Sequence, residues 1–241
     1  MNYKRLTPLV TLAITTLLAL AAIPAFAEPA GFPSHVLNGI DALQKLPAEG
    51  FHVVESQGRT LLVSTNGHYV VLGGRILDLW NQVEIRRVAD VPKTQRIPLN
   101  RLRLDLDDLG GVTIGDGPQV VVFLDPLSKE TPRLLEEIRA LQSAYQFRLV
   151  FMPARADRRR TSQARACSPA DARRFIHTGE TPKSIPGDPG CGKAPLQKTL
   201  VTASLLGIKS VPFTIAPNGA TIQGHSANYR GFLEENRHSI P

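Results

Sequence analysis

Hydrophobic and polar positions fall into blocks along the chain, and the clearest block lies near its centre. Residues 120–124 form an uninterrupted apolar run, which is typical of a strand covered on both faces. Apolar side chains then recur at the spacing of a helix face, at Leu134, Leu135, Ile138 and Leu141. The pattern predicts a buried strand that enters a helix through a sharp turn at residues 125–131.

The region before this block has the pattern of a small α+β unit. Residues 33–46 carry apolar side chains at helical spacing and predict an amphipathic helix. Asn66-Gly67 indicates a hairpin with a type I′ turn, in which both central residues need positive φ. Short β-rich runs lie at residues 51–55, 60–65, 68–72 and 75–80. One small sheet with one helix leaves an edge and a face uncovered, so we expect a homodimer through residues 28–95.

Residues 96–111 allow two interpretations. Apolar and charged residues alternate from Arg101 to Asp107, as in a strand, whereas Leu99, Leu102, Leu106 and Leu109 keep the spacing of a helix face. We favour a linker helix, which the glycine pair 110–111 ends. Residues 112–241 then form a second domain.

That second domain continues with an order of elements that the sequence pattern predicts throughout. A strand at residues 147–152 lies parallel to the first, because the helix between them makes a right-handed crossover. Helices follow at residues 164–177 and 195–208, then strands at 212–216 and 221–223 around a turn, and a helix at 228–237.

The composition is that of an ordinary globular protein, and the first residues have the pattern of an export signal. The 241 residues are 42% apolar and 20% charged. Lys4 and Arg5 precede an apolar run that ends in Ala25-Phe26-Ala27, a pattern typical of a secretory signal peptide (residues 1–27) cleaved after Ala27. An uncleaved membrane anchor is the alternative, although the run is short for a span. Cleavage removes two basic and no acidic residues, which lowers the net charge from +7 to +5.

The basic residues do not by themselves indicate a nucleic-acid partner. They are densest in residues 155–174, where acids interrupt them and no nucleic-acid motif accompanies them. We therefore interpret this cluster as a solvated helix face. No membrane contact is expected after signal cleavage, and no motif for a cofactor is present.

The chain has two cysteines, Cys167 and Cys191. An even pair in an exported chain suggests a disulfide, and a reactive pair is the alternative. A metal site is poorly supported, because zinc sites use short paired spacings that are absent here.

The central block resembles the thioredoxin superfamily. The frame Phe-x-Asp-x-x-Cys-x-x-Cys-x-x-Leu fits Phe123, Asp125, Ser128, Thr131 and Leu134, with hydroxyl residues at both cysteine positions. The mature chain as a whole resembles the DsbC/DsbG family of periplasmic disulfide isomerases. Three segments carry this likeness: residues 66–78, similar to the family's dimerisation sheet; residues 207–213 with 217–219 and Gly224, similar to its cis-proline segment; and Cys167 with Cys191, which look like its structural disulfide.

The resemblance implies a fold and also a departure from the family's chemistry. It implies an α+β dimerisation domain joined by a linker helix to an α/β thioredoxin-like domain, with a cis bond before Pro212. It also implies that Val211 offers main-chain groups to a bound polypeptide. Disulfide exchange needs a thiolate, which neither Ser128 nor Thr131 supplies. We expect Thr131, before Pro132, to cap the following helix.

Three hypotheses of function follow. The first is a dimeric periplasmic protein that holds unfolded or extended polypeptides without exchanging disulfides, so that Ser128 and Thr131 are vestigial and no residue is catalytic. The second is disulfide interchange through Cys167 and Cys191. The third is an accessory role in a secretion or conjugation system. A nucleophilic Ser128 is disfavoured, because no histidine lies near it in sequence.

Overall fold

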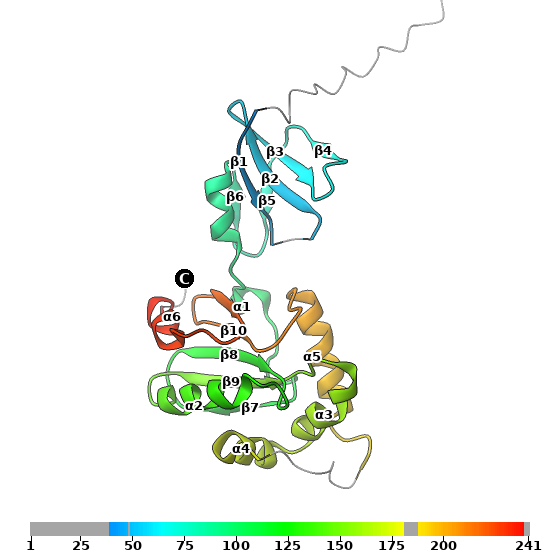
Figure 1. The fold of residues 1–241 in the computed structure, drawn as a ribbon, viewed down its shortest axis with the longest axis vertical. Coiled ribbons are helices and arrows are strands. Elements are labelled where there is room, and N and C mark those ends of the chain that lie inside the picture. The colour runs from blue at the N-terminus through cyan, green and yellow to red at the C-terminus, as the bar shows by residue number, and fades with distance from the viewer. Residues whose placement is uncertain (1–38, 48, 181–187, 239–241) are drawn as a thin grey trace, which may run out of the picture. The chain divides into compact units, whose positions relative to one another are not determined.

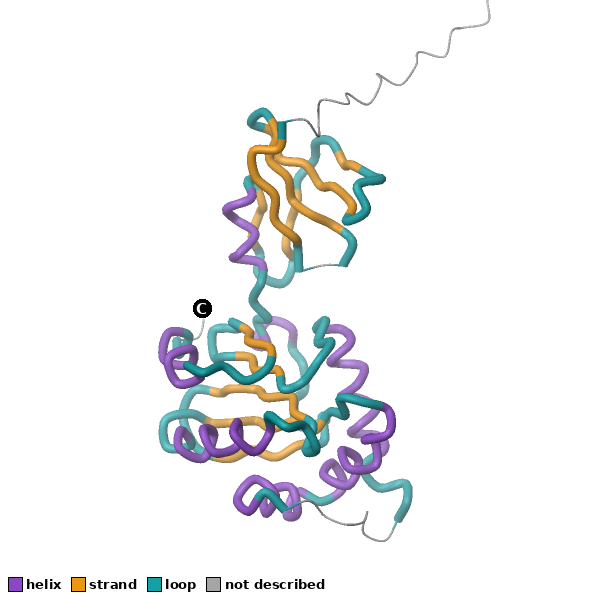
Figure 2. Tube along the Cα trace, viewed as in Figure 1, coloured by secondary structure: helices purple, strands orange, loops and turns teal. Residues whose placement is uncertain are grey.

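A computed structural model describes residues 39–47, 49–180 and 188–238 of the chain (Figures 1 and 2). The signal peptide, its cleavage after Ala27 and residues 33–38 of the first predicted helix lie outside the described residues. Within the described ranges, no helix has the length and apolar character needed to cross a membrane.

The first part of the described chain is built from hairpins. Its main sheet has the order β1-β2-β3-β4, with every neighbouring pair antiparallel. The strands are β1 (Ile40–Lys45), β2 (Phe51–Ser56), β3 (Arg59–Ser64) and β4 (Val70–Val71). A second hairpin, β5 (Ile76–Asp78) and β6 (Val83–Ile85), leads into the 3₁₀ helix η2 (Val88–Thr94). Val53, Ile85, Val88 and Val91 form the buried core that these elements share.

The helix predicted for residues 33–46 is wrong over residues 40–45, which form strand β1. This segment pairs with β2, from Ile40 opposite Ser56 to Lys45 opposite His52. Ala42 and Leu46 pack against the core, whereas Ile40 and Leu43 are 42% and 53% exposed. The apolar residues at helical spacing therefore do not share a buried face, because pairing with β2 imposes the two-residue period of a strand.

The hairpin predicted around Asn66-Gly67 is confirmed, because β3 and β4 pair antiparallel on either side of it, but its type I′ turn is wrong. Gln57 and Gly58, between β2 and β3, both have positive φ, at 50° and 73°. At the predicted turn, Gly67 has positive φ but Asn66 does not. The Asn66 side chain instead accepts hydrogen bonds from the Ser64 hydroxyl and the His68 N–H. These two hydrogen bonds to the Asn66 side chain stabilise the longer connection between β3 and β4.

The linker helix predicted for residues 96–111 is also wrong for most of its length. Only α1 (Leu99–Leu102) is helical, and Arg103 ends it with a left-handed conformation at φ 50°. Leu104, Leu106 and Leu109 nevertheless pack against the core of the following sheet without helical structure. Strand β7 (Gly111–Ile114) begins directly afterwards. A Cβ on Gly111 would lie 2.2 Å from Leu149 O, so only glycine fits where β7 meets β9.

The second part of the chain is a five-stranded sheet with the strand order of a thioredoxin fold, β11-β10-β8-β9-β7. Its remaining strands are β8 (Gln119–Leu124), β9 (Gln146–Phe151), β10 (Phe213–Ile215) and β11 (Thr221–Gln223). β8 and β9 are parallel and joined by α2 (Thr131–Leu141), and the other three pairs are antiparallel. The predicted buried strand and helix at the centre of the chain are confirmed.

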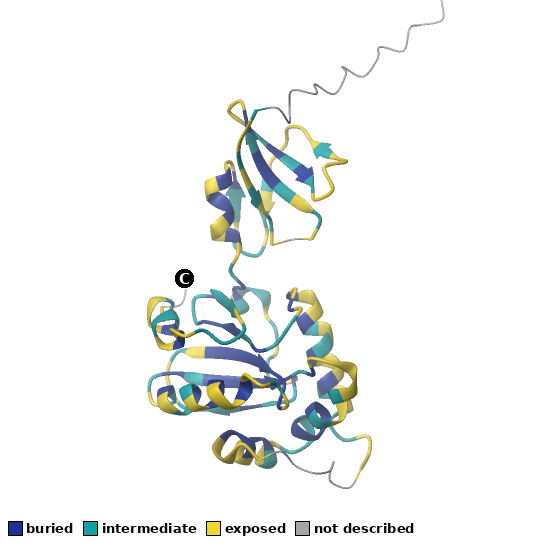
Figure 3. Ribbon diagram, in the orientation of Figure 1, coloured by how far each residue is buried: buried dark blue, intermediate teal, exposed yellow. Residues whose placement is uncertain are grey.

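Helices cover both faces of this sheet (Figure 3). On one face, α2, α4 (Pro169–Thr178) and α6 (Tyr229–Glu235) pack against Val120, Val122 and Leu124. On the other face, α5 (Lys193–Leu205) contributes Ala203 to a cluster that contains Val121 and Phe123. Residues 120–124 are all 0% exposed, which explains why their run of apolar side chains has no polar interruption.

The single helix predicted for residues 164–177 is two helices. α3 (Arg159–Cys167) follows the short 3₁₀ helix η3 (Ala156–Arg158) and ends before Ser168. Ser168 has extended backbone, and its hydroxyl accepts the Asp171 N–H at 3.2 Å. Pro169 then occupies the first turn of α4, where its missing N–H is not needed.

Candidate functional site

The 125–131 turn lies at the carboxyl end of β8 and is organised by the side chain of Asp125. This carboxylate is 0% exposed. Its Oδ1 accepts the Leu127 N–H at 2.8 Å, and its Oδ2 accepts the Ala154 N–H at 2.8 Å. One buried side chain therefore holds both the start of the turn and the segment that follows β9. Buried carboxylates need such partners to offset the loss of hydration.

Arg158 supplies the positive charge that a buried carboxylate requires. Its Nη1 lies 3.3 Å from Asp125 Oδ2 and also donates to Leu127 O at 3.2 Å. The arginine side chain is 29% exposed. Because Arg158 precedes α3 and Asp125 begins the turn before α2, this ion pair positions the beginnings of the two helices side by side.

Thr131 is a structural residue in this turn. It is 0% exposed, and its hydroxyl donates to Asp125 O at 2.7 Å. It lies inside α2, and Glu130 occupies the cap position without a capping hydrogen bond, so the predicted capping role of Thr131 is wrong. The hydroxyl bonds backward to the turn because that carbonyl lies within its reach. Its burial leaves this hydroxyl without access to a substrate.

Ser128 differs from Thr131 in being partly exposed. Its N–H donates to Asp125 O at 3.0 Å, and its Oγ has only a long 3.5 Å contact with the Glu130 N–H. Across the residues that the structure describes, no imidazole or amine contacts this hydroxyl. The geometry therefore contains no base that could activate Ser128 as a nucleophile.

The segment at Val211 and Pro212 lies next to this turn through the register of the sheet. Phe213 of β10 pairs with Phe123 of β8, so continuing the antiparallel register places Val211 beside Asp125. The bond between Val211 and Pro212 is cis. Pro212 O accepts the Gly224 N–H at 2.8 Å. Within the described ranges, the Val211 N–H and C=O have no hydrogen-bond partner.

Two further contacts bring the end of β11 to the same place. Glu130 Oε2 lies 3.8 Å from where a Cβ on Gly224 would be. His225 Nε2 contacts Glu137 Oε1 of α2 at 2.9 Å. The register and these contacts thus place the 125–131 turn, Val211 and Gly224, which are far apart in the sequence, around one partly exposed edge.

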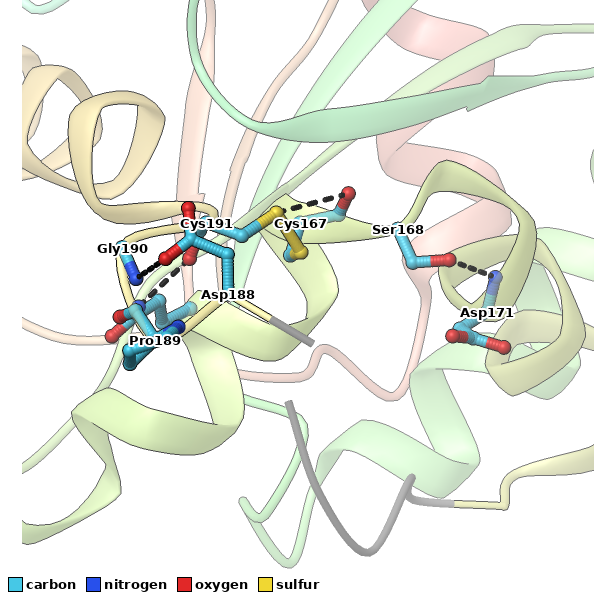
Figure 4. Close-up of a disulfide and its surroundings, with 8 residues drawn as sticks. Cys167, Ser168, Asp171, Asp188, Pro189, Gly190 and Cys191 are labelled. Atoms are coloured by element: carbon cyan, nitrogen blue, oxygen red, sulfur yellow. Dashed lines mark hydrogen bonds between the residues drawn. A yellow bond between two sulfur atoms is a disulfide. The ribbon is translucent and has the colours of Figure 1, made fainter. Parts of the chain in front are cut away.

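Cys167 and Cys191 form a disulfide, which confirms the predicted bond (Figure 4). It joins the end of α3 to Cys191, which lies two residues before the start of α5, with the two Cα atoms 5.2 Å apart. Gln163 Nε2 donates to Cys191 O at 2.7 Å and to Pro189 O at 3.0 Å. Gly190 N–H donates to Asp188 Oδ1 at 2.7 Å. Polar contacts therefore hold the backbone around the bond as well.

The basic cluster at residues 155–174 is only partly the solvated face that the sequence indicated. Arg165 is 1% exposed, and its guanidinium stacks 4.5 Å above the Phe175 ring. Its Nη2 donates to Glu180 O at 3.0 Å, and burial lowers its pKa to about 10. Arg158 is held in the Asp125 ion pair. Arg155, Arg159, Arg160, Arg173 and Arg174 are exposed, as expected.

Sequence reasoning placed Asp125 in a motif but assigned it no role, and it did not connect Arg158 with it. A carboxylate directly after a fully apolar strand is the signal that could have found Asp125, because such a residue is buried with the strand end. Arg158 lies 33 positions away, and only the parallel pairing of β8 with β9 brings the two together.

Comparisons with known proteins give structural likeness only. No protein-family model matches the chain, and no curated protein matches it. A disulfide interchange protein from Neisseria gonorrhoeae has a similar structure, with 22% identity and a TM-score of 0.47, over 56% of this chain and 100% of that chain. DsbG from Helicobacter pylori is similar over 73% of this chain and 92% of that chain, with 15% identity and a TM-score of 0.34.

Proposed function

We propose that this chain is a DsbC-like, exported polypeptide-binding protein that does not exchange disulfides. The observation that carries the proposal is the 125–131 turn, where Ser128 and Thr131 replace a cysteine pair and Thr131 is buried with its hydroxyl bonded to Asp125 O. The chain's two cysteines are bonded to each other elsewhere. The periplasm is its compartment, reached by the signal peptide that ends at Ala27.

The edge at Val211 supplies the binding surface in this proposal. An extended polypeptide satisfies the hydrogen-bonding groups of its own main chain by pairing with free N–H and C=O groups at the end of a strand. The unpaired Val211 main chain is of this kind, and the partly exposed Ser128 lies beside it. Leu127, 43% exposed on the turn, offers apolar contact to a side chain of the client.

An insulin-reduction assay on the mature protein tests the absence of exchange activity. We expect no turnover above background, because neither hydroxyl forms a thiolate. Turnover comparable to that of an active thioredoxin-fold enzyme would refute the proposal and favour exchange through Cys167 and Cys191. Ser128→Cys combined with Thr131→Cys is expected to restore little activity, because position 131 is buried against Asp125 O.

Suppression of aggregation of a reduced, unfolded client tests binding. Val211→Asp is expected to weaken client binding, because the added carboxylate lies on the proposed surface. It should lower the melting temperature only modestly, because Val211 is half-buried and packs against the cluster that contains Val121 and Phe123. Val201→Asp is the matched control, since Val201 is 61% exposed on α5. Equal loss of binding and of stability in Val211→Asp would assign the segment a purely structural role.

Exposed apolar side chains in and beside the hairpins of the first part of the described chain support a homodimer through residues 28–95. They include Tyr69, Leu72, Leu77 and Leu79, which are 65%, 56%, 51% and 82% exposed. Such residues favour association with a second copy. Light scattering on the mature chain is expected to show a dimer that Leu77→Asp with Leu79→Asp dissociates, whereas Leu205→Asp on α5 does not. A monomeric wild type at micromolar concentration would contradict this proposal.

A further inference from the structure

In addition to the free main-chain groups of Val211, the edge around Ser128 contains the amino ends of two helices. α2 starts at the end of the 125–131 turn, and α3 starts directly after Arg158. The Asp125–Arg158 ion pair and the Arg158–Leu127 hydrogen bond join the two segments. Both helices follow parallel neighbouring strands, β8 and β9, so their amino ends meet at the same edge of the sheet.

Exposed basic side chains surround this junction. Lys129 and Arg133 lie on the turn and the first turn of α2, and Arg155, Arg159 and Arg160 lie at the start of η3 and α3. We call these five residues the basic edge. Two exposed acids lie among them: Glu130, and Asp157, which contacts Arg155 at 3.2 Å. Asp125 is buried and paired with Arg158, so the exposed charge at this edge is positive.

The placement of these charges is unfavourable for the helices themselves. The amino end of a helix carries partial positive charge, and acidic residues normally stabilise it. Neither α2 nor α3 has an acidic residue in its first turn or a side-chain hydrogen bond at its cap. Arg133, Arg159 and Arg160 lie there instead. The helix ends and the side chains therefore add to one positive field, which an anionic partner would neutralise.

We infer that the basic edge selects extended polypeptides that carry acidic side chains. This inference rests on the proposed polypeptide-binding function and names the class of client. A main chain paired to Val211 runs past the 125–131 turn, so its carboxylates come within reach of the basic edge. A polypeptide fits better than a nucleic acid, because a strand can pair with the free Val211 N–H and C=O and a phosphate backbone cannot. It also fits better than a lipid surface, since Leu127 is the single exposed large apolar residue described on the two segments.

Fluorescence anisotropy with the full mature chain tests the inference. The probes are a labelled extended peptide with alternating Asp and Glu side chains and a peptide of the same sequence with Asn and Gln in their place. We expect the acidic peptide to bind roughly tenfold more tightly at low salt, because several weak surface attractions add. The difference should shrink as salt is raised to about 0.3 M, where exposed charges are screened.

Two double-arginine variants test which basic residues cause the preference for the acidic peptide. Arg159→Gln with Arg160→Gln is expected to weaken binding of the acidic peptide roughly three- to tenfold and to leave the amide peptide unchanged. Arg173→Gln with Arg174→Gln on α4 removes the same charge and is expected to change neither. Equal losses in the two variants would overturn the assignment to the basic edge, because net charge alone would then explain the preference.

The outcomes separate this inference from the function on which it rests. If both peptides bind equally well, the acidic preference is overturned and the polypeptide-binding function stands. If neither peptide binds and the unfolded client is not bound, the function itself fails. Tighter binding to single-stranded DNA, or to vesicles containing phosphatidylserine, than to the acidic peptide would overturn the choice of a polypeptide partner.

Discussion

Two segments of the second part of the described chain hold their backbone by different means. The 125–131 turn depends on hydrogen bonds and one ion pair around the buried carboxylate of Asp125. The connection between α3 and α5 depends on the covalent bond between Cys167 and Cys191, with Gln163 bonded to the backbone beside it. The chain therefore carries a disulfide beside α3 and α5, whereas the 125–131 turn carries the hydroxyl residues Ser128 and Thr131.

The difference predicts that the 125–131 turn keeps its shape when the Cys167–Cys191 bond is reduced. Reduction opens the bond at α3 and α5 but changes no group that contacts Asp125. The turn is sensitive instead to substitutions that remove a buried polar partner. A buried group left without its hydrogen bond has lost its hydration, and no partner compensates for that loss. Each segment can therefore be disturbed without the other.

Removing the disulfide is expected to have the largest effect. Cys167→Ser with Cys191→Ser frees a loop that spans 24 positions, which lowers the free energy of unfolding by about 3.5 kcal/mol in the chain-entropy model. Urea unfolding followed by circular dichroism measures this loss. Client binding at a temperature where the variant is folded should be unchanged. A variant that is stable but has lost client binding would break the comparison and favour a role of the cysteines in function.

Asp125→Ala is expected to cost nearly as much, about 2–4 kcal/mol. The substitution leaves two backbone N–H groups and Arg158 without their acceptor, and the value is lowered because Arg158 is 29% exposed. Urea unfolding again supplies the measurement. Asp116→Ala, at an exposed aspartate, is the control and should change the free energy by less than about 0.5 kcal/mol. A loss as small as that of the control would mean that the carboxylate does not organise the turn.

Thr131→Val and Ser128→Ala sharpen the comparison between the two hydroxyl positions. Thr131→Val removes a buried hydrogen bond to Asp125 O and should cost about 1 kcal/mol. Ser128→Ala removes only a long contact from a partly exposed residue and should cost less than about 0.5 kcal/mol. The denaturant midpoints of the two variants measure these losses of unfolding free energy. Equal costs would show that both hydroxyls serve the turn in the same way.

The smallest effect on stability is expected at the surface carboxylate of Glu84. Hydrogen bonds from Arg75 and Arg86 lower its pKa from 4.5 to about 2. A lowered pKa in the folded state stabilises the protein above pH 4.5 and loses this contribution as the pH falls towards 2. The stabilities of wild type and Glu84→Gln should therefore differ slightly near neutral pH and converge over that window. A difference that is constant with pH would mean that the ion pairs contribute nothing.

Several elements followed from the sequence and others did not, for reasons visible at particular residues. β8 and α2 were predictable, because a strand that is buried on both faces needs apolar side chains at every position and the helix beside it needs one apolar stripe. β1 was not, because its helical spacing of apolar residues is overridden by pairing with β2. The leucines of residues 96–111 were predicted to share one face of a linker helix, but the left-handed Arg103 ends α1 early, and Leu104, Leu106 and Leu109 pack against the core without helical structure.

At the site, the sequence by itself determined which chemistry is missing, since Ser128 and Thr131 cannot form thiolates whatever fold surrounds them. Only the tertiary structure decided what the remaining groups do. It buries Thr131 against Asp125 O, pairs Asp125 with Arg158 and leaves the Val211 main chain unpaired beside them. Residue identity sets the chemistry of a side chain, but its burial and partners arise from strands and helices that meet across long stretches of the chain. Those contacts are properties of the fold and not of any local pattern.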